Sequence, residues 1–154
     1  MDIRRAQASD LDKVREITHK TINGIYPHYY PAGAVAFFLD HHCGENISAD
    51  IAEGRVYLLY SADGNAAGTV TVKENEICRL FVLPEYQGKG YGRALLGFAE
   101  AEIGNSYDEI TVDASLSAKS IYLRRGYREA EYHIIETASG DRLCYDLMKK
   151  RAEK

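Results

Sequence analysis

Glycine at every second position of residues 88–92 constrains the fold more than any other feature of this chain. The run reads Gln87-Gly88-Lys89-Gly90-Tyr91-Gly92 and stands between a strand-like segment ending at Pro84 and a helical pattern over residues 90–103. Glycine admits backbone conformations closed to other residues and lets a ligand approach without meeting a Cβ. The amides of such a turn, together with the positive end of the following helix, favour an anion such as a phosphate. The sequence therefore predicts a strand, an anion-binding turn and a helix in succession; a plain tight turn is the alternative.

Two better-known phosphate-binding loops do not match this segment. A Walker A loop needs Ser or Thr after Gly-Lys, whereas Gly90 follows Lys89. A Rossmann fingerprint needs Gly-x-Gly-x-x-Gly, whereas the spacing in this chain is Gly-x-Gly-x-Gly and Arg93 stands at the final position. Both of these nucleotide-binding folds are disfavoured.

The rest of the chain alternates strand-like and helical patterns, with no linker or internal repeat. Strands are predicted at residues 3–6, 55–60, 67–72, 76–83, 109–112, 132–137 and 143–148. Helices are predicted from residue 9 to Pro27, from Pro31 to residue 39, and over residues 46–53, 90–103 and 118–125. This order predicts one domain over residues 1–154, of mixed α/β class. Its sheet would contain antiparallel hairpins and a central strand–helix–strand crossover.

Composition and charge narrow the function classes. The chain has 154 residues with 19 Lys and Arg against 23 Asp and Glu, a net charge of −4, whereas a dedicated nucleic-acid binder usually carries a basic surplus. Residues 1–6 lack the apolar region of a signal peptide, and no apolar run is long enough to span a bilayer. We therefore expect a cytoplasmic protein that binds neither nucleic acid nor membrane.

The cysteine and histidine residues predict neither a disulfide framework nor a metal centre. Cys43, Cys78 and Cys144 are odd in number and widely spaced, which favours buried thiols. His41 and His42 precede Cys43, but adjacent residues on a helix point about 100° apart and do not converge on one ion.

Three motifs in sequence order resemble those of the GNAT-type N-acetyltransferases. Residues 87–92 match in full that family's acetyl-CoA loop, Gln/Arg-x-x-Gly-x-Gly/Ala. Leu80, Val82 and Pro84 match the Leu-x-Val-x-Pro strand that precedes the loop, and residues 118–127 match an Ala-x-x-x-Tyr segment that ends in Gly-Phe/Tyr. The element order agrees over essentially the whole chain. The resemblance implies a GNAT acyltransferase fold, with a central mixed, largely antiparallel sheet flanked by helices, and acetyl-CoA as the cosubstrate of an N-acetyltransferase domain over residues 1–154.

The resemblance also implies a set of cofactor-binding residues. In the family, one central strand bulges and splays from the next, and the pantetheine arm enters the gap along its backbone. By this resemblance acetyl-CoA would contact the strand edge, the glycine loop with its flanking side chains, and a serine after the next strand. These are Leu80, Phe81, Val82, Gln87, Gly88, Lys89, Gly90, Tyr91, Gly92, Arg93 and Ser115. Ser115 departs from the asparagine often found there and has a shorter reach.

Two residues are candidates for proton transfer. Tyr122 takes the place of the family's usual general acid, which protonates the departing thiolate; a packed core aromatic is the alternative. Glu76 is the leading candidate for the base that deprotonates the amine, and strand alternation, before any bulge, puts Glu76, Cys78, Leu80 and Val82 on one face. A water chain is the alternative base, and a solvated or salt-bridged strand-end glutamate is the structural alternative. Because direct transfer needs no nucleophilic side chain, an acyl-cysteine route through Cys78 is disfavoured.

The acceptor site of the family lies around the first two helices and their connection. That connection contains Tyr26, His28, Tyr29 and Tyr30, which could line an amine pocket or pack as a corner. We expect an acetyl-CoA-dependent N-acetyltransferase that acetylates a primary amine, of a small molecule or a peptide, by direct transfer in a ternary complex. The family favours a homodimer. The alternatives are a non-catalytic acyl-CoA-binding module and a toxin-like aminoacyl-tRNA acetyltransferase, and the acidic net charge weighs against the latter.

Overall fold

A single seven-stranded sheet forms the centre of the molecule. The computed structural model describes residues 1–154 and gives the strand order β1-β2-β3-β4-β5-β7-β6. The strands are β1 (Asp2–Arg5), β2 (Val56–Tyr60), β3 (Ala66–Lys73), β4 (Glu76–Val82), β5 (Glu109–Ala114), β6 (Arg128–Glu136) and β7 (Arg142–Arg151). Every neighbouring pair is antiparallel except β4 and β5, which are parallel. The expected mixed, largely antiparallel sheet is confirmed.

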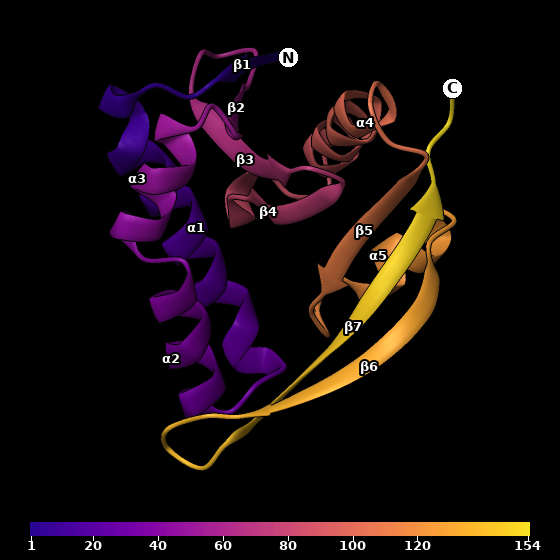
Figure 1. The fold of residues 1–154 in the computed structure, drawn as a ribbon. Helices are drawn as coiled ribbons and strands as arrows, with labels where there is room; N and C mark the ends of the chain where they lie inside the picture. Colours follow the sequence, from indigo (N-terminus) through magenta and orange to yellow (C-terminus); the bar gives the residue numbers. More distant parts are fainter.

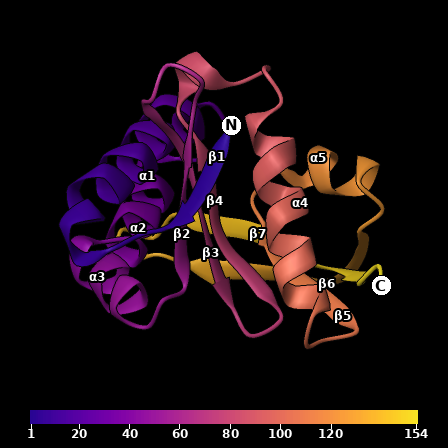
Figure 2. The ribbon, with the colours of Figure 1, turned by 90° about the horizontal axis from the view of Figure 1, so that it is seen from above.

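Helices cover both faces of the half of the sheet formed by β1 to β4. On one face lie α1 (Leu11–Ile25), α2 (Ala32–His41) and α3 (Gly44–Ala52), and on the other lies α4 (Tyr91–Gly104) (Figures 1 and 2). The short helix α5 (Lys119–Arg124) follows β5. No helix is both long and apolar enough to cross a membrane.

Two apolar cores lie on opposite faces of the sheet. Successive side chains of a strand point to opposite faces, so Leu58 joins the core beneath α1 to α3 while Leu59 joins the core beneath α4. Ile22 of α1 and Leu95 of α4 are fully buried in these two cores. Burial of a side chain of this size stabilises the fold by roughly 1.5–3 kcal/mol. The sheet between the two cores is therefore held from both sides.

The sheet opens between β4 and β5. These strands pair only at Glu76 with Thr111 and at Ile77 with Val112. Beyond that point β5 continues along β7, while β4 continues along β3. The two halves of the sheet therefore diverge, as Figure 1 shows. The remainder of β4 has no strand partner on its β5 side.

A β-bulge at Cys78 changes which residues of β4 share a face. Arg79 lies opposite Thr71 and Ile77 lies opposite Val72, so β4 has one residue more than β3 across this step. As a consequence Ile77 and Val82 belong to the same core, although simple alternation would put them on opposite faces. The prediction that Glu76 shares a face with Leu80 and Val82 is therefore wrong: Glu76 shares the face of Arg79 and Phe81.

Several strand boundaries differ from those predicted, and two of them lie on the strands that pair with β7. β6 begins at Arg128 rather than at residue 132, and β5 extends to Ala114 rather than stopping at residue 112. The additional residues of β6 are exposed and, apart from Ala130, charged, and they join the strand because β7 pairs with it there. Pairing between distant segments, rather than local pattern, sets both boundaries.

Candidate active site

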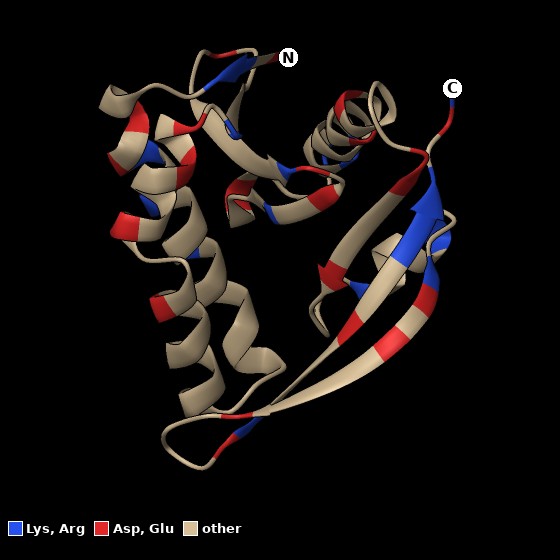
Figure 3. Ribbon diagram, viewed as in Figure 1, with Lys and Arg blue, Asp and Glu red and all other residues tan.

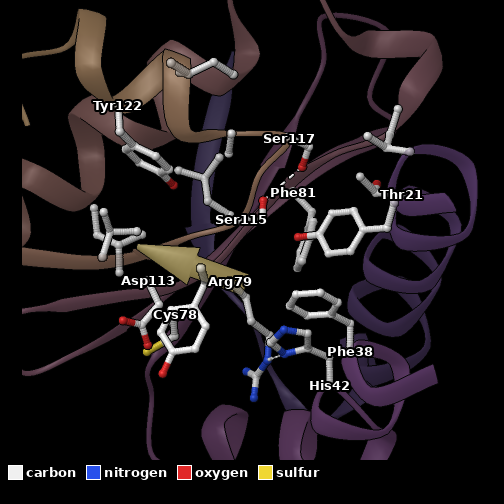
Figure 4. Close-up of a pocket in the computed structure, with 18 of the residues that line it drawn as sticks. Thr21, Phe38, His42, Cys78, Arg79, Phe81, Asp113, Ser115, Ser117 and Tyr122 are labelled. Carbon is white, nitrogen blue, oxygen red and sulfur yellow. Dashed lines mark hydrogen bonds between the residues drawn. The ribbon is translucent and has the colours of Figure 1, made fainter. Parts of the chain in front are cut away.

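A cavity of about 700 Å³ occupies the opening between β4 and β5. Side chains from α1, α2, β4, β5, α5 and β7 line it, and Figure 4 shows several of them pointing inward. It collects candidate residues from distant parts of the sequence: Tyr26, Glu76, Leu80, Phe81, Val82, Gln87, Gly88, Gly92, Ser115 and Tyr122. The cavity therefore joins the glycine turn at one end to the α1–α2 region at the other.

The glycine turn presents unpaired backbone amides. Gly88 and Gly90 have φ angles of 74° and 90°, in the left-handed region that favours glycine. The N–H groups of residues 88–93 donate no backbone hydrogen bond, and α4 begins at Tyr91. A Cβ built on Gly88 or Gly90 would meet nothing within 4 Å, so the space in front of the turn is open. This open cradle of amides at a helix N-terminus fits a phosphate group.

The charged residues of the turn do not line the cavity. Lys89 donates through Nζ to the carbonyl oxygen of Glu85 at 3.0 Å and lies over the ring of Tyr86. Arg93 is exposed on the first turn of α4. Gly90 and Tyr91 belong to the same turn but also lie outside the lining. Contact of these four residues with acetyl-CoA stays a prediction.

The end of β4 is held by side chains on its open side. Gln87 donates through Nε2 to the carbonyl oxygen of Val82 at 2.9 Å, and Thr21 of α1 donates through Oγ1 to the same oxygen at 3.3 Å. These bonds fix the strand edge beside the cavity. On the opposite wall the hydroxyl of Ser115 lies 2.9 Å from that of Ser117.

Tyr122 is buried with its hydroxyl directed into the cavity (Figure 4). Its ring packs edge-on against Tyr127, with the ring centroids 5.3 Å apart. Burial raises the pKa of Tyr122 well above its ordinary value, and the neighbouring Tyr26 and Glu100 add to the shift. The phenol is therefore protonated at neutral pH and can donate a proton or a hydrogen bond, but it cannot serve as a base.

Glu76 lies half-buried at the start of β4 and lines the same cavity. Burial raises its pKa, the carboxylate of Asp113 raises it further, and Lys73 opposes the shift. Burial also raises the pKa of Asp113. A carboxylate with a raised pKa holds a proton more firmly than an exposed one, which suits a general base.

The thiol of Cys78 is not activated. Burial, and next the charge of Glu76, raise the pKa of Cys78 to about 12. Because the thiolate and not the thiol is the nucleophile, Cys78 has little nucleophilic character at neutral pH. The structure thus offers no support for an acyl-cysteine route.

The four residues of the α1–α2 connection occupy different environments. Tyr26 lines the cavity, whereas His28 and Tyr29 are exposed outside its lining. Tyr30 is buried, and its hydroxyl donates to the carbonyl oxygen of Cys144 at 3.1 Å and accepts from the N–H of Leu116 at 2.7 Å. Tyr30 therefore ties this connection to β7 and to the segment after β5. A role in binding substrate stays a prediction for all four.

Several cavity residues carry no sequence signal. Asp113, His42 and Arg79 line it, and Nε of Arg79 donates to Nδ1 of His42 at 2.9 Å. His42 and Arg79 are 37 positions apart in the chain. A single sequence gives no pattern that pairs them. On the sequence alone, His42 is considered only as a possible metal ligand. Asp113 is missed because the predicted strand stops one residue before it.

Comparisons with known proteins bear on the family of this chain. The model of the acetyltransferase (GNAT) domain matches residues 25–138. The UPF0157 protein YqkA of Bacillus subtilis (strain 168) is 33% identical in an alignment of 78 positions, which covers 47% of this chain and 23% of that protein. The matched region thus spans less than a quarter of the length of that curated relative.

Solved structures share the fold. A GCN5-related N-acetyltransferase structure from Rhodopseudomonas palustris, described as aminotransferase, class-II, has a TM-score of 0.88 and 21% identity and covers 97% of this chain and 94% of its own. The PaiA N-acetyltransferase of Thermoplasma acidophilum, solved in complex with coenzyme A, has a TM-score of 0.71 and 19% identity and covers 97% and 98%. These similarities extend over nearly the whole of each chain.

Proposed function

Because this chain belongs to the GNAT acetyltransferase family, we propose that it transfers the acetyl group of acetyl-CoA directly to a primary amine. The chain is a GNAT acetyltransferase domain, and acetyl-CoA is that family's acetyl donor. The observation that carries the proposal is the opening between β4 and β5, because one cavity there meets the glycine turn, Tyr122 and Glu76.

The glycine turn and the strand edge support the binding of acetyl-CoA. The unpaired amides of residues 88–93 would hold the pyrophosphate, as the N-terminus of a helix does for other phosphates. The unpaired side of β4, along Leu80, Phe81 and Val82, would bind the pantetheine arm through those backbone groups that face the opening. When bound in this way, acetyl-CoA supplies a thioester as the activated acetyl group.

Three groups of the chain would then carry the transfer. Glu76 removes a proton from the attacking amine, directly or through water. A backbone N–H of the β4 edge donates to the acetyl oxygen as negative charge develops on it. Tyr122 donates its phenolic proton, or a hydrogen bond, to the sulfur that leaves; phenol and thiol have ordinary pKa values of about 10 and about 8.5, so the phenol is still protonated when the thiolate departs.

The experiment is release of free CoA thiol from acetyl-CoA in the presence of a panel of primary amines. We expect release that depends on the amine and that falls steeply in Tyr122→Phe. A folded wild-type protein that binds acetyl-CoA but acetylates no amine would favour the non-catalytic acyl-CoA-binding module instead.

The expected partners follow from the same proposal. The acceptor is the amine of a small molecule or of a peptide or protein, and the cytoplasmic location and the homodimer stay predictions.

The charges do not favour an aminoacyl-tRNA acceptor. The basic residues at the end of β7 (Figure 3) include Lys149 and Lys150, which lie 3.3 Å and 3.4 Å from carboxylate oxygens of Glu109 and Glu100. Both ammonium groups are therefore already paired with carboxylates.

A further inference from the structure

A buried histidine in the cavity has a hydrogen-bonding capacity that the acetyl-transfer chemistry leaves unused. His42 directly follows α2, is 7% exposed and lines the cavity. Its ring meets the ring of Phe81 edge-on, with the centroids 5.7 Å apart, and its carbonyl oxygen lies 2.8 Å from Nε2 of His19. Backbone and ring are both held in place.

The hydrogen bond from Arg79 fixes the tautomer of His42. Nε of Arg79 lies 2.9 Å from Nδ1 of His42, and a guanidinium can only donate. Nδ1 must therefore accept, and the single proton of the neutral imidazole is on Nε2. Burial, and next the charge of Arg79, lower the pKa of His42 to about 3, so the ring is neutral throughout the physiological range.

Arg79 is itself locked in position. It is 4% exposed, and its Nη1 lies 2.6 Å from Oδ2 of Asp50 and 3.3 Å from the hydroxyl of Thr71. Lys73 lies 3.1 Å from the other oxygen of Asp50. Because Arg79 and Asp50 are both buried, the guanidinium has little freedom to move away from Nδ1 of His42.

The N–H at Nε2 of His42 is accessible from the cavity. Nε2 has no hydrogen-bond partner within the protein, since the only bond of the ring is the one from Arg79. It is also not enclosed: the only fully enclosed side-chain polar atoms without a hydrogen-bond partner are the hydroxyl of Tyr60 and Oδ2 of Asp50, and the latter is ion-paired with Arg79. Figure 4 shows His42 and Arg79 beside Cys78 and Asp113 in the cavity. His42 therefore offers a fixed donor there and cannot act as a base.

The bulge at Cys78 puts Arg79, which holds His42, on the same face of β4 as the candidate base Glu76. Arg79 and Glu76 lie opposite Thr71 and Lys73 on β3, which are two positions apart on one face. Two positions correspond to about 7 Å along a strand. Within one cavity the carboxylate of Glu76 favours an amine nitrogen, whereas the N–H of His42, held by Arg79, favours an oxygen.

We propose that His42 determines acceptor specificity by donating its Nε2–H to a carbonyl oxygen of the acceptor, and that the preferred acceptor is an α-amino carbonyl compound. This inference rests on the proposed function and assigns its substrate class. The nitrogen would face Glu76 and Asp113, and the neighbouring carbonyl would face His42.

A pair of acceptors that differ in one group tests the inference. L-Norleucine methyl ester and n-pentylamine have the same alkyl chain with and without the carbonyl group. We expect His42→Phe to lower kcat/KM for the ester about 10-fold, with less than a 2-fold change for n-pentylamine, because a hydrogen bond to one substrate only is lost. His42→Gln keeps an N–H donor and should recover the ester to within about 3-fold of wild type. Equal losses for both amines, or no recovery in His42→Gln, would overturn the inference.

A measurement without turnover separates this inference from the proposed function. Two-dimensional ¹H–¹⁵N spectra of the imidazole show which nitrogen carries the proton. We expect the proton on Nε2 of His42 between pH 5 and pH 9 in the wild-type protein, and a shift of that resonance when the ester is added to the complex with CoA. A proton on Nδ1, or a resonance that the ester leaves unmoved, contradicts the inference. The proposed function fails separately, if no amine releases thiol from acetyl-CoA.

Discussion

At the scale of single residues, burial shifts two pKa values upward with different chemical consequences. Tyr122 becomes a weaker acid and remains a proton donor at every pH the protein meets. Glu76 becomes a stronger base, because burial and the charge of Asp113 favour its protonated form. An acid and a base in one active site are expected to have environments that keep one group protonated and make the other a proton acceptor.

Tyr122→Phe removes the hydroxyl and keeps the ring that packs on Tyr127. We expect kcat to fall about 100-fold, because general acid catalysis contributes at least that much. The affinity for acetyl-CoA should stay within about 2-fold of wild type, as calorimetry would measure. An unchanged kcat would show that Tyr122 is a packed core aromatic and not the general acid.

Glu76→Gln removes the base and also a carboxylate that is unfavourably buried. Folding raises the pKa of Glu76, so protonation favours the folded state, and stability falls as pH rises from the ordinary pKa of glutamate through the raised one. The variant should therefore unfold no more easily than wild type at pH 7, while kcat falls about 100-fold.

The pH profile gives the control for that variant. Wild-type kcat should decline as pH falls through the raised pKa of Glu76, and this acid limb should be absent from the residual activity of Glu76→Gln. Full activity in Glu76→Gln would show that Glu76 is not the base and would favour a water chain in that role.

At the scale of elements, the glycine turn joins β4 to α4 and sets the direction of its amides. Gly90→Ala puts a side chain at a φ of 90°, which costs roughly 1–2 kcal/mol for a residue with a Cβ. We expect the turn to relax and the affinity for acetyl-CoA to weaken about 10-fold by calorimetric titration.

Gly64 offers the matched control for Gly90. It lies in the turn between β2 and β3 with a φ of 85°, and a Cβ there also meets nothing within 4 Å. Gly64→Ala should therefore carry similar backbone strain without changing the affinity for acetyl-CoA. If both substitutions weakened acetyl-CoA binding equally, backbone strain in general, and not damage to the amide cradle, would explain the loss of affinity.

The elements themselves could be predicted because their signals are local. Apolar spacing over residues 90–103 and the glycines before it suffice for α4 and its turn. The resemblance implies a bulged central strand, but the position of the bulge at Cys78 could not be predicted, because it depends on how β4 meets β3 across the hairpin. The bond between Arg79 and His42 likewise depends on the packing of α2 and α3 against the sheet. Local pattern therefore predicts the cofactor side of the site, and tertiary pairing decides its acceptor side.

At the scale of the whole molecule, the opening between β4 and β5 separates two parts of one sheet that few backbone bonds connect. A ligand that fills the opening would bridge them and bind only the folded state. At an acetyl-CoA concentration of 100 times Kd, we expect about 2.7 kcal/mol of added stability. That corresponds to a rise in Tm of roughly 5–10 °C for a chain of this length, by thermal unfolding.

Gly90→Glu is the control for that ligand-induced stabilisation. A carboxylate in the amide cradle would repel the pyrophosphate, so this variant should show little rise in Tm with acetyl-CoA. A rise equal to that of wild type would mean that the ligand binds elsewhere on the molecule.

The most direct test of direct acetyl transfer in a ternary complex is the initial rate of CoA release, measured while acetyl-CoA and a primary amine are both varied. Direct transfer predicts double-reciprocal lines that intersect, since both substrates must be bound before either product leaves. Parallel lines would indicate a covalent acyl-enzyme and would contradict the protonated state of Cys78. Release of CoA that does not depend on any amine would contradict the account as a whole.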